Sequence, residues 1–96
     1  MNIELLHNIC KDATRKAFNE FKRQVEVELF PFNNSLKENL QKQMLEQIRM
    51  QVTKEYMSKN NLSIQQLKVL DEVINQYSNI ALKTSDNYSK KINPSI

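Results

Sequence analysis

Apolar side chains recur every three or four positions along three stretches of this chain, the spacing that places them on one face of a helix. The stretches cover residues 3–29, 36–58 and 64–82. The middle stretch is the most regular, with an apolar residue at every fourth position: Leu36, Leu40, Met44, Ile48, Val52 and Tyr56. The pattern predicts an all-α protein of three amphipathic helices.

Short polar segments separate the three predicted helices. Pro31 cannot donate a backbone hydrogen bond, so it ends the first helix. Ser35 and Ser63 each precede a Glu or a Gln by three residues, the capping-box arrangement that begins a helix. Between them, Lys59-Asn60-Asn61 predicts a turn in which an Asn takes the left-handed conformation. Because this connection is short, the second and third helices should form a long antiparallel hairpin.

The last stretch of the chain, residues 83–96, has no helical period. Its apolar residues are scattered among Ser, Asn and Lys. We therefore expect a single helical domain over residues 1–82 and a disordered tail over residues 83–96. Three helices of this length leave part of the apolar stripe of the second helix uncovered. A homodimer that closes into a larger bundle would bury it.

Composition agrees with a helical, soluble protein. Glycine is absent and proline occurs only at Pro31 and Pro94, whereas strand-rich folds need both residues for their tight turns. The chain has no apolar run long enough to cross a membrane and no secretion signal at its start, so we expect a cytoplasmic protein without membrane contact. The net charge of +3 is mildly basic and selects no class of partner by itself.

The inventory of reactive side chains argues against cofactor-dependent catalysis. His7 and Cys10 are the only His and Cys of the chain, and together they make at most half of a metal site. A chain without glycine has no glycine-rich loop to hold a phosphate. We therefore expect no cofactor and no metal. Cys10 falls within the apolar stripe of the first helix, which predicts a buried, inert thiol.

Basic residues on the first predicted helix suggest a nucleic-acid interface as one alternative. Lys11, Arg15 and Lys22 fall on one side of that helix, where they could contact a phosphate backbone. Asp12 and Glu20 interleave with them, as on an ordinary solvated face. Nucleic-acid binding is therefore the last of three hypotheses.

The third predicted helix contains Leu70-Asp71-Glu72-Val73-Ile74-Asn75-Gln76-Tyr77, after a long helix and an Asn-rich turn. This arrangement resembles the small two-helix aspartyl-phosphate phosphatases of the sporulation phosphorelay in spore-forming bacteria. Their hallmark is Ser-Gln-Glu-Leu-Asp, followed by an Ile-Asn-x-Tyr-like continuation. The Leu-Asp and Ile-Asn-x-Tyr parts match, whereas Leu67 stands at the position of the hallmark serine. The first predicted helix has no counterpart in the minimal hairpin.

The resemblance implies a hairpin that docks on a response regulator and removes phosphate from its aspartate. Asp71 would then orient the attacking water, and Asp71, Asn75, Tyr77 and Leu67 would form the partner-binding face. Replacement of the serine by Leu67 affects hydrolysis more than docking. We therefore expect first a small regulatory protein that binds a protein partner through its hairpin. A response-regulator phosphatase is the first alternative.

Overall fold

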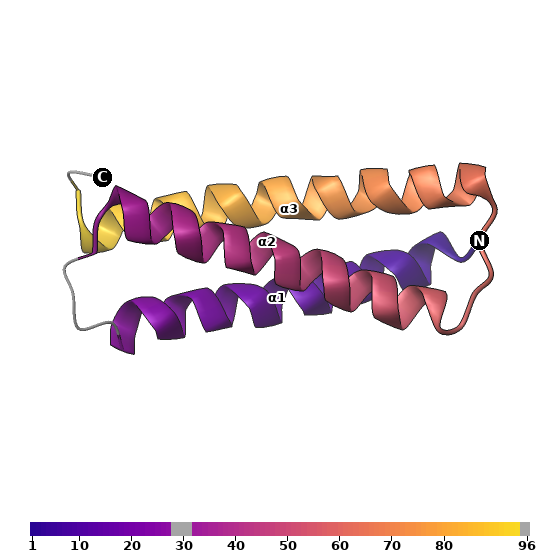
Figure 1. Ribbon diagram of the computed structural model, residues 1–96, viewed down its shortest axis with the longest axis horizontal. Coiled ribbons are helices and arrows are strands. Elements are labelled where there is room, and N and C mark those ends of the chain that lie inside the picture. The colour runs from indigo at the N-terminus through magenta and orange to yellow at the C-terminus, as the bar shows by residue number, and fades with distance from the viewer. Residues whose placement is uncertain (28–31, 95–96) are drawn as a thin grey trace.

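The computed structural model describes residues 1–27 and 32–94, and these form three α-helices without a strand, as predicted. The helices are α1 (Ile3–Val27), α2 (Asn34–Met57) and α3 (Ile64–Ile92). They run antiparallel in succession along a rod of 45 × 19 × 19 Å, so α1 and α3 point the same way (Figure 1). All three pairs of helices are in contact, and α1 with α2 forms the most extensive pair.

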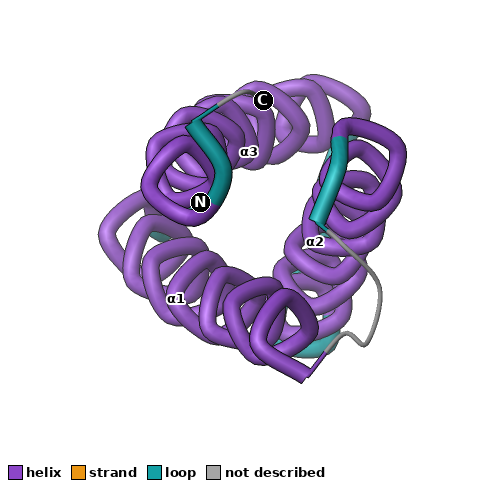
Figure 2. The backbone as a smooth tube through the Cα atoms, turned by 90° about the vertical axis from the view of Figure 1, so that its left-hand side faces the viewer, coloured by secondary structure: helices purple, strands orange, loops and turns teal. Residues whose placement is uncertain are grey.

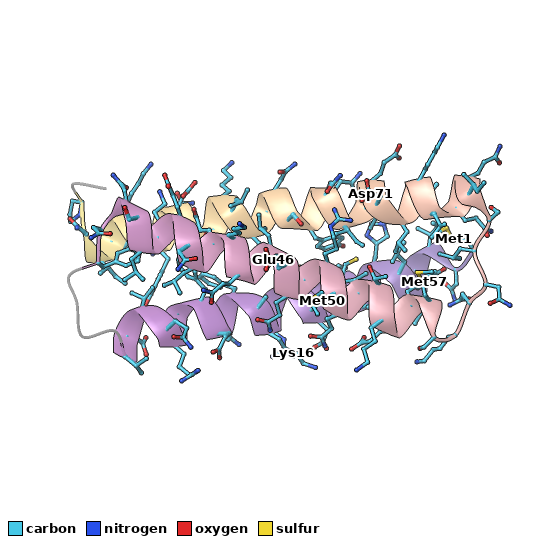
Figure 3. All side chains as sticks on the ribbon, in the orientation of Figure 1. Met1, Lys16, Glu46, Met50, Met57 and Asp71 are labelled. Carbon is cyan, nitrogen blue, oxygen red and sulfur yellow. The ribbon has the colours of Figure 1, made fainter. Side chains whose placement is uncertain are left out.

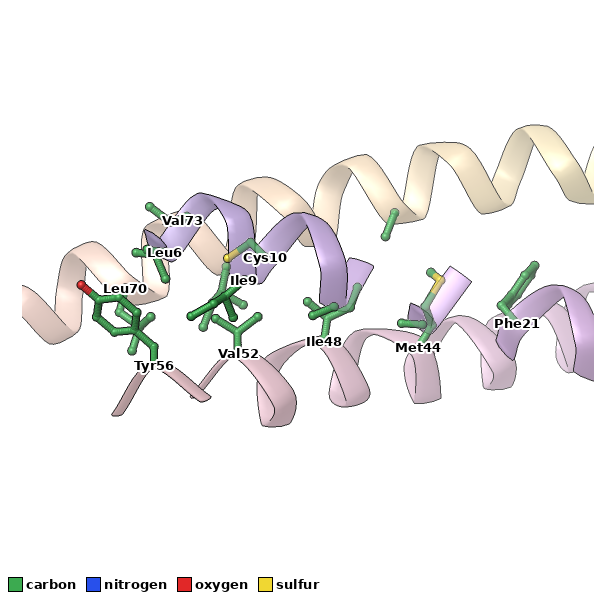
Figure 4. Packing of buried hydrophobic residues seen from close by; sticks show 14 of the residues in the cluster. Leu6, Ile9, Cys10, Phe21, Met44, Ile48, Val52, Tyr56, Leu70 and Val73 are labelled. Carbon is green, nitrogen blue, oxygen red and sulfur yellow. The ribbon is translucent and has the colours of Figure 1, made fainter. Parts of the chain in front are cut away.

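One apolar core runs along the axis of the rod (Figure 4). The spacing of four residues between apolar side chains on α2 explains the shape of this core. Each step of four residues turns the stripe by about 40° beyond a full turn, so between Leu40 and Tyr56 it winds by about 160° around the helix. The helices accordingly wind around one another rather than lying parallel (Figure 2). The buried apolar residues are Leu6, Ile9, Cys10, Ala13, Ala17, Phe21, Val25, Leu40, Met44, Ile48, Val52, Tyr56, Leu70, Val73, Ile74 and Ala81.

The starts of α2 and α3 show one wrong and one confirmed prediction. Helix α2 begins earlier than predicted, because the side chain of Asn33, not Ser35, caps it and accepts a hydrogen bond from the backbone N–H of Leu36 at 2.9 Å. Asn is as good an N-cap as Ser and stands earlier in the chain. At α3, Ser63 and Gln66 form the predicted reciprocal capping box, with hydrogen bonds of 3.2 and 3.0 Å.

The end of α2 was predicted to within one residue, but the left-handed Asn expected there was wrong. No described residue has a positive φ angle, so no Asn in the left-handed conformation ends the helix. Instead, Ser58 keeps right-handed helical angles, and the side chain of Asn60 donates to the carbonyl of Tyr56 at 2.9 Å. The same carbonyl also accepts a hydrogen bond from the backbone N–H of Lys59 at 3.3 Å, so a side chain and a turn together satisfy it at the helix end. The predicted extension of the first helix through Leu29, and the break at Pro31, lie outside the described residues.

Helix α3 continues past its predicted end at Leu82 to Ile92, so the expected disordered tail was wrong over this segment. Its buried face there is made of Ala81, Ser85 and Ser89. The hydroxyl of Ser85 donates to the carbonyl of Leu82 at 2.9 Å, and that of Ser89 to the carbonyl of Ser85 at 2.7 Å. Serine hydroxyls bonded within their own helix can be buried at low cost. A search for large apolar residues does not detect such a face.

Candidate functional site

A shallow groove separates α2 from α3, which contact each other less extensively than either contacts α1. Leu45 of α2 and Leu82 of α3 supply its apolar part, and both are half-buried. Polar side chains line the rest: Glu46, Arg49, Asn75, Ser78 and Asn79. Figure 3 shows Glu46 on α2 and Asp71 on the neighbouring α3. Of the residues predicted for the partner-binding face, Asn75 lines the groove.

Arg49 connects the two helices at this groove. Its Nη1 lies 2.5 Å from Oδ1 of Asp71, and its Nη2 donates to Oδ1 of Asn75 at 2.8 Å. Asp71 and Asn75 are one helical turn apart, so one planar guanidinium reaches both. Arg49 and Asp71 are both largely exposed, and an exposed ion pair contributes less than about 1 kcal/mol. The bridge therefore orients side chains more than it stabilises the fold.

Two predicted site residues, Asp71 and Asn75, thus lie together, while Arg49 was missing from the predicted site. A signal for it exists in the sequence. Arg49 and Asp71 are equally distant from Asn60, the centre of the turn. In an antiparallel hairpin, residues equally distant from the turn lie side by side, so an Arg and an Asp at such positions can pair.

The other two predicted residues of this face lie apart from the groove. Leu67 is exposed on α3, one turn before Asp71. Tyr77 lies on the α1 side of α3, where a hydrogen bond of 2.8 Å joins its hydroxyl to Nδ1 of His7. Burial raises the pKa of Tyr77, and the nearby Cys10 adds to this increase. Tyr77 therefore serves the contact between α1 and α3.

Two of the three cations of the predicted nucleic-acid face, Arg15 and Lys22, have close partners within the protein. Lys11 is exposed. Arg15 pairs with Asp12 at 2.6 Å, and this hydrogen bond lowers the pKa of the Asp12 carboxyl. The ammonium of Lys22 lies over the rings of Phe18 and Tyr88, 5.6 and 5.7 Å from their centroids. Such cations are less free to bind phosphate than the sequence pattern indicates.

Cys10 is fully buried in the core, as predicted. Burial raises the pKa of its thiol from 9.0 to about 11, which makes it a poor nucleophile near neutral pH.

Across residues 1–27 and 32–94, no group of three His, Cys, Asp or Glu side chains is placed to hold a metal ion. No helix of this part of the chain has the length and apolar character needed to cross a membrane.

Comparison of the chain with protein-family models, with curated proteins and with solved structures found no match. The groove between α2 and α3 is therefore the feature from which a function is inferred.

Proposed function

We propose that this protein is a small regulatory protein that binds another protein through the groove between α2 and α3. The observation that supports this most directly is the bridge from Arg49 to Asp71 and Asn75, which holds a charged group in a fixed orientation beside Leu45 and Leu82. Interfaces between proteins combine such apolar contact areas with a few oriented polar groups. A binding protein needs no further chemistry.

The shape of the groove favours a helix as its occupant. Two antiparallel helices with a groove between them can accept a third along their length, as in a four-helix bundle. An amphipathic helix of the partner would place apolar residues on Leu45 and Leu82 and a polar residue opposite Arg49. Met50, which is 72% exposed on the outer side of α2, would extend the contact, and methionine adapts readily to different apolar surfaces (Figure 3).

Photo-crosslinking from within the groove tests this proposal. A photoreactive residue at Ser78, inside the groove, should link to one defined partner, whereas the same residue at exposed Asn8 of α1 should not. The partner, once purified, should bind the Arg49→Glu variant at least about tenfold more weakly in calorimetry, because the substitution places a carboxylate beside Asp71 and Glu46. Equal crosslinking from both positions, or unchanged affinity of the Arg49 variant, would contradict the proposal.

A second candidate, an aspartyl-phosphate phosphatase, is favoured by the exposed pair of Asp71 and Asn75 beside a guanidinium. Arg49 could bind the oxygens of an acyl phosphate, and Asp71 could orient a water molecule in line with the phosphorus. It ranks second because the carboxylate of Asp71 is already engaged by Arg49.

Phosphate release from phosphorylated response regulators separates the two candidates. Release that depends on the protein and disappears in Asp71→Ala supports the phosphatase. Binding without release supports docking alone. If Asp71→Ala left the release rate unchanged, Asp71 would have no catalytic role.

A further inference from the structure

The last part of α3, residues 83–92, is attached to α1 and α2 by contacts unlike those in the rest of the core. Within this segment, all of which the structure describes, the buried side chains are the serines Ser85 and Ser89. No large aliphatic side chain of the segment is buried. We call residues 83–92 the latch segment, because polar and aromatic side chains fasten it to the other two helices.

Tyr88 fastens the latch segment to α1. Its ring meets Phe18 and Phe21 edge-on, with centroids 5.9 and 6.3 Å apart. The ammonium of Lys22 lies over both Phe18 and Tyr88. The Tyr88 hydroxyl also lies 3.5 Å from a carboxylate oxygen of Glu26. Aromatic pairs and cations above rings each add directional attraction to the area that they bury.

Asp86 fastens the latch segment to α2. Its carboxylate accepts hydrogen bonds from Nζ of Lys37 at 2.9 Å and from Nε2 of Gln41 at 2.8 Å. The hydrogen bond from Lys37, with that from Gln41, lowers the pKa of Asp86. Gln41 also donates to the hydroxyl of Ser85 at 2.8 Å. The side chain of Lys37 is only 16% exposed and Gln41 only 7%, so both are nearly buried under their partners from α3.

These contacts make the segment easier to detach than the part of α3 before it. Opening at Leu70, Val73 and Ile74 would remove large side chains from the core, whereas opening over 83–92 mainly breaks polar and aromatic contacts. The surface that it uncovers is well defined. It holds the rings of Phe18 and Phe21 with the ammonium of Lys22 on α1, and the side chains of Lys37 and Gln41 on α2.

We propose that the latch segment is an internal ligand that covers a second protein-binding surface on α1 and α2. The external ligand of that surface is a helical segment with a carboxylate and an aromatic side chain two positions apart, as Asp86 and Tyr88 are. The aromatic residue of this ligand packs on the rings of Phe18 and Phe21, and its carboxylate pairs with Lys37. A nearly buried ammonium without such a partner would be unfavourable. The residues of this surface are different from those that line the groove, although Gln41 and Asp86 stand one helical turn from Leu45 and Leu82 of the groove, so each proposal rests on its own contacts.

A labelled peptide with the sequence of residues 79–93 tests whether the surface beneath the latch segment binds such a ligand. Its affinity for the full chain is measured by fluorescence anisotropy. The wild-type chain should bind it weakly, because its own latch segment occupies the surface. Tyr88→Ala in the chain should raise the affinity at least about tenfold, and adding Lys37→Ala should reverse the gain. Lys42→Ala, an exposed lysine of the same helix, is the matched control and should leave the gain intact. A peptide carrying D86N and Y88A should not bind.

Hydrogen exchange of the full chain tests the opening without any peptide. Backbone amides of the latch segment should exchange as one unit, faster than those between Leu70 and Tyr77. Gln41→Ala, on the opposite helix, should accelerate exchange of the whole segment about tenfold, and Lys42→Ala should not. Simple fraying of the helix end would instead give exchange rates that decrease gradually from Ile92 inward and that neither substitution changes. That gradient, or a Tyr88→Ala chain that is folded by circular dichroism but gains no peptide affinity, would overturn the proposal.

Discussion

Helix α3 is attached to the other two helices by different contacts at its two ends. At the end where α1 begins, Leu6 of α1, Tyr56 of α2 and Leu70 of α3 are buried in one apolar cluster (Figure 4). At the opposite end, Gln41 and Asp86 form a polar contact between α2 and α3. Apolar packing contributes much free energy but has no preferred direction. Hydrogen bonds contribute less net free energy but require particular distances and angles between donor and acceptor. The contacts of α3 at the first end therefore contribute mainly stability, whereas those at the second set the alignment of α3 against α2 and are the ones that we propose can open.

Truncation of a core residue at the apolar end should have the largest effect. Ile74→Ala should lower the free energy of unfolding by about 2–5 kcal/mol, because it removes buried methyl groups and leaves a cavity. Ile80→Ala on the same helix is the control, and should change stability by less than about 0.5 kcal/mol, since Ile80 is 55% exposed while Ile74 is 1% exposed. Urea unfolding followed by circular dichroism measures both. Equal losses would mean that burial does not distinguish the two sites.

Thiol labelling measures how tightly the apolar end is closed. The pKa of Cys10 is raised from 9.0 to about 11, so near pH 8 its thiolate fraction falls roughly 100-fold below that of a free thiol, and burial hinders the reagent further. Labelling by a disulfide reagent should therefore be at least that much slower in the folded chain than in urea. Rapid labelling of the folded protein would show that this end opens readily.

Two serine substitutions should resolve the polar end. Ser85→Ala should cost about 1 kcal/mol, because the hydroxyl accepts a hydrogen bond from buried Gln41. Ser89→Ala is its match, since the hydroxyl of Ser89 donates to a carbonyl of its own helix, and should change stability by less than about 0.5 kcal/mol. Thermal unfolding of both variants makes the comparison. A larger loss from Ser89→Ala would refute the assigned role of Gln41.

The smallest effect is expected at the groove. A double-mutant cycle of Arg49→Ala and Asp71→Ala should give a coupling free energy below about 1 kcal/mol that decreases with added salt, because both side chains are largely exposed. Unfolding at low and high ionic strength provides the measurement. A coupling of several kcal/mol would place the groove among the stabilising parts of the fold instead of its binding surfaces.

Sequence patterns predicted the elements of this fold more reliably than their ends. The ladder from Leu40 to Tyr56 and the capping box at Ser63 are local, because side-chain spacing and capping involve only neighbours within one helix. The end of α3 is not local. Ser85 and Ser89 are polar residues that favour turns in isolation, and they are helical here while buried against α1 and α2.

The candidate site divides in the same way. The sequence alone placed Asp71 and Asn75 on one face of a helix, because residues four apart share a face. The packing of α2 against α3 brought Arg49 to them, as their equal distances from Asn60 indicate. Tyr77, two residues after Asn75, points to another side of the helix by helix geometry alone, and only the position of α1 gave it His7 as a partner. The sequence by itself thus determined three helices, their apolar faces and one cap. The tertiary structure decided which polar side chains meet, because such contacts depend on the alignment of helices that are distant in the chain.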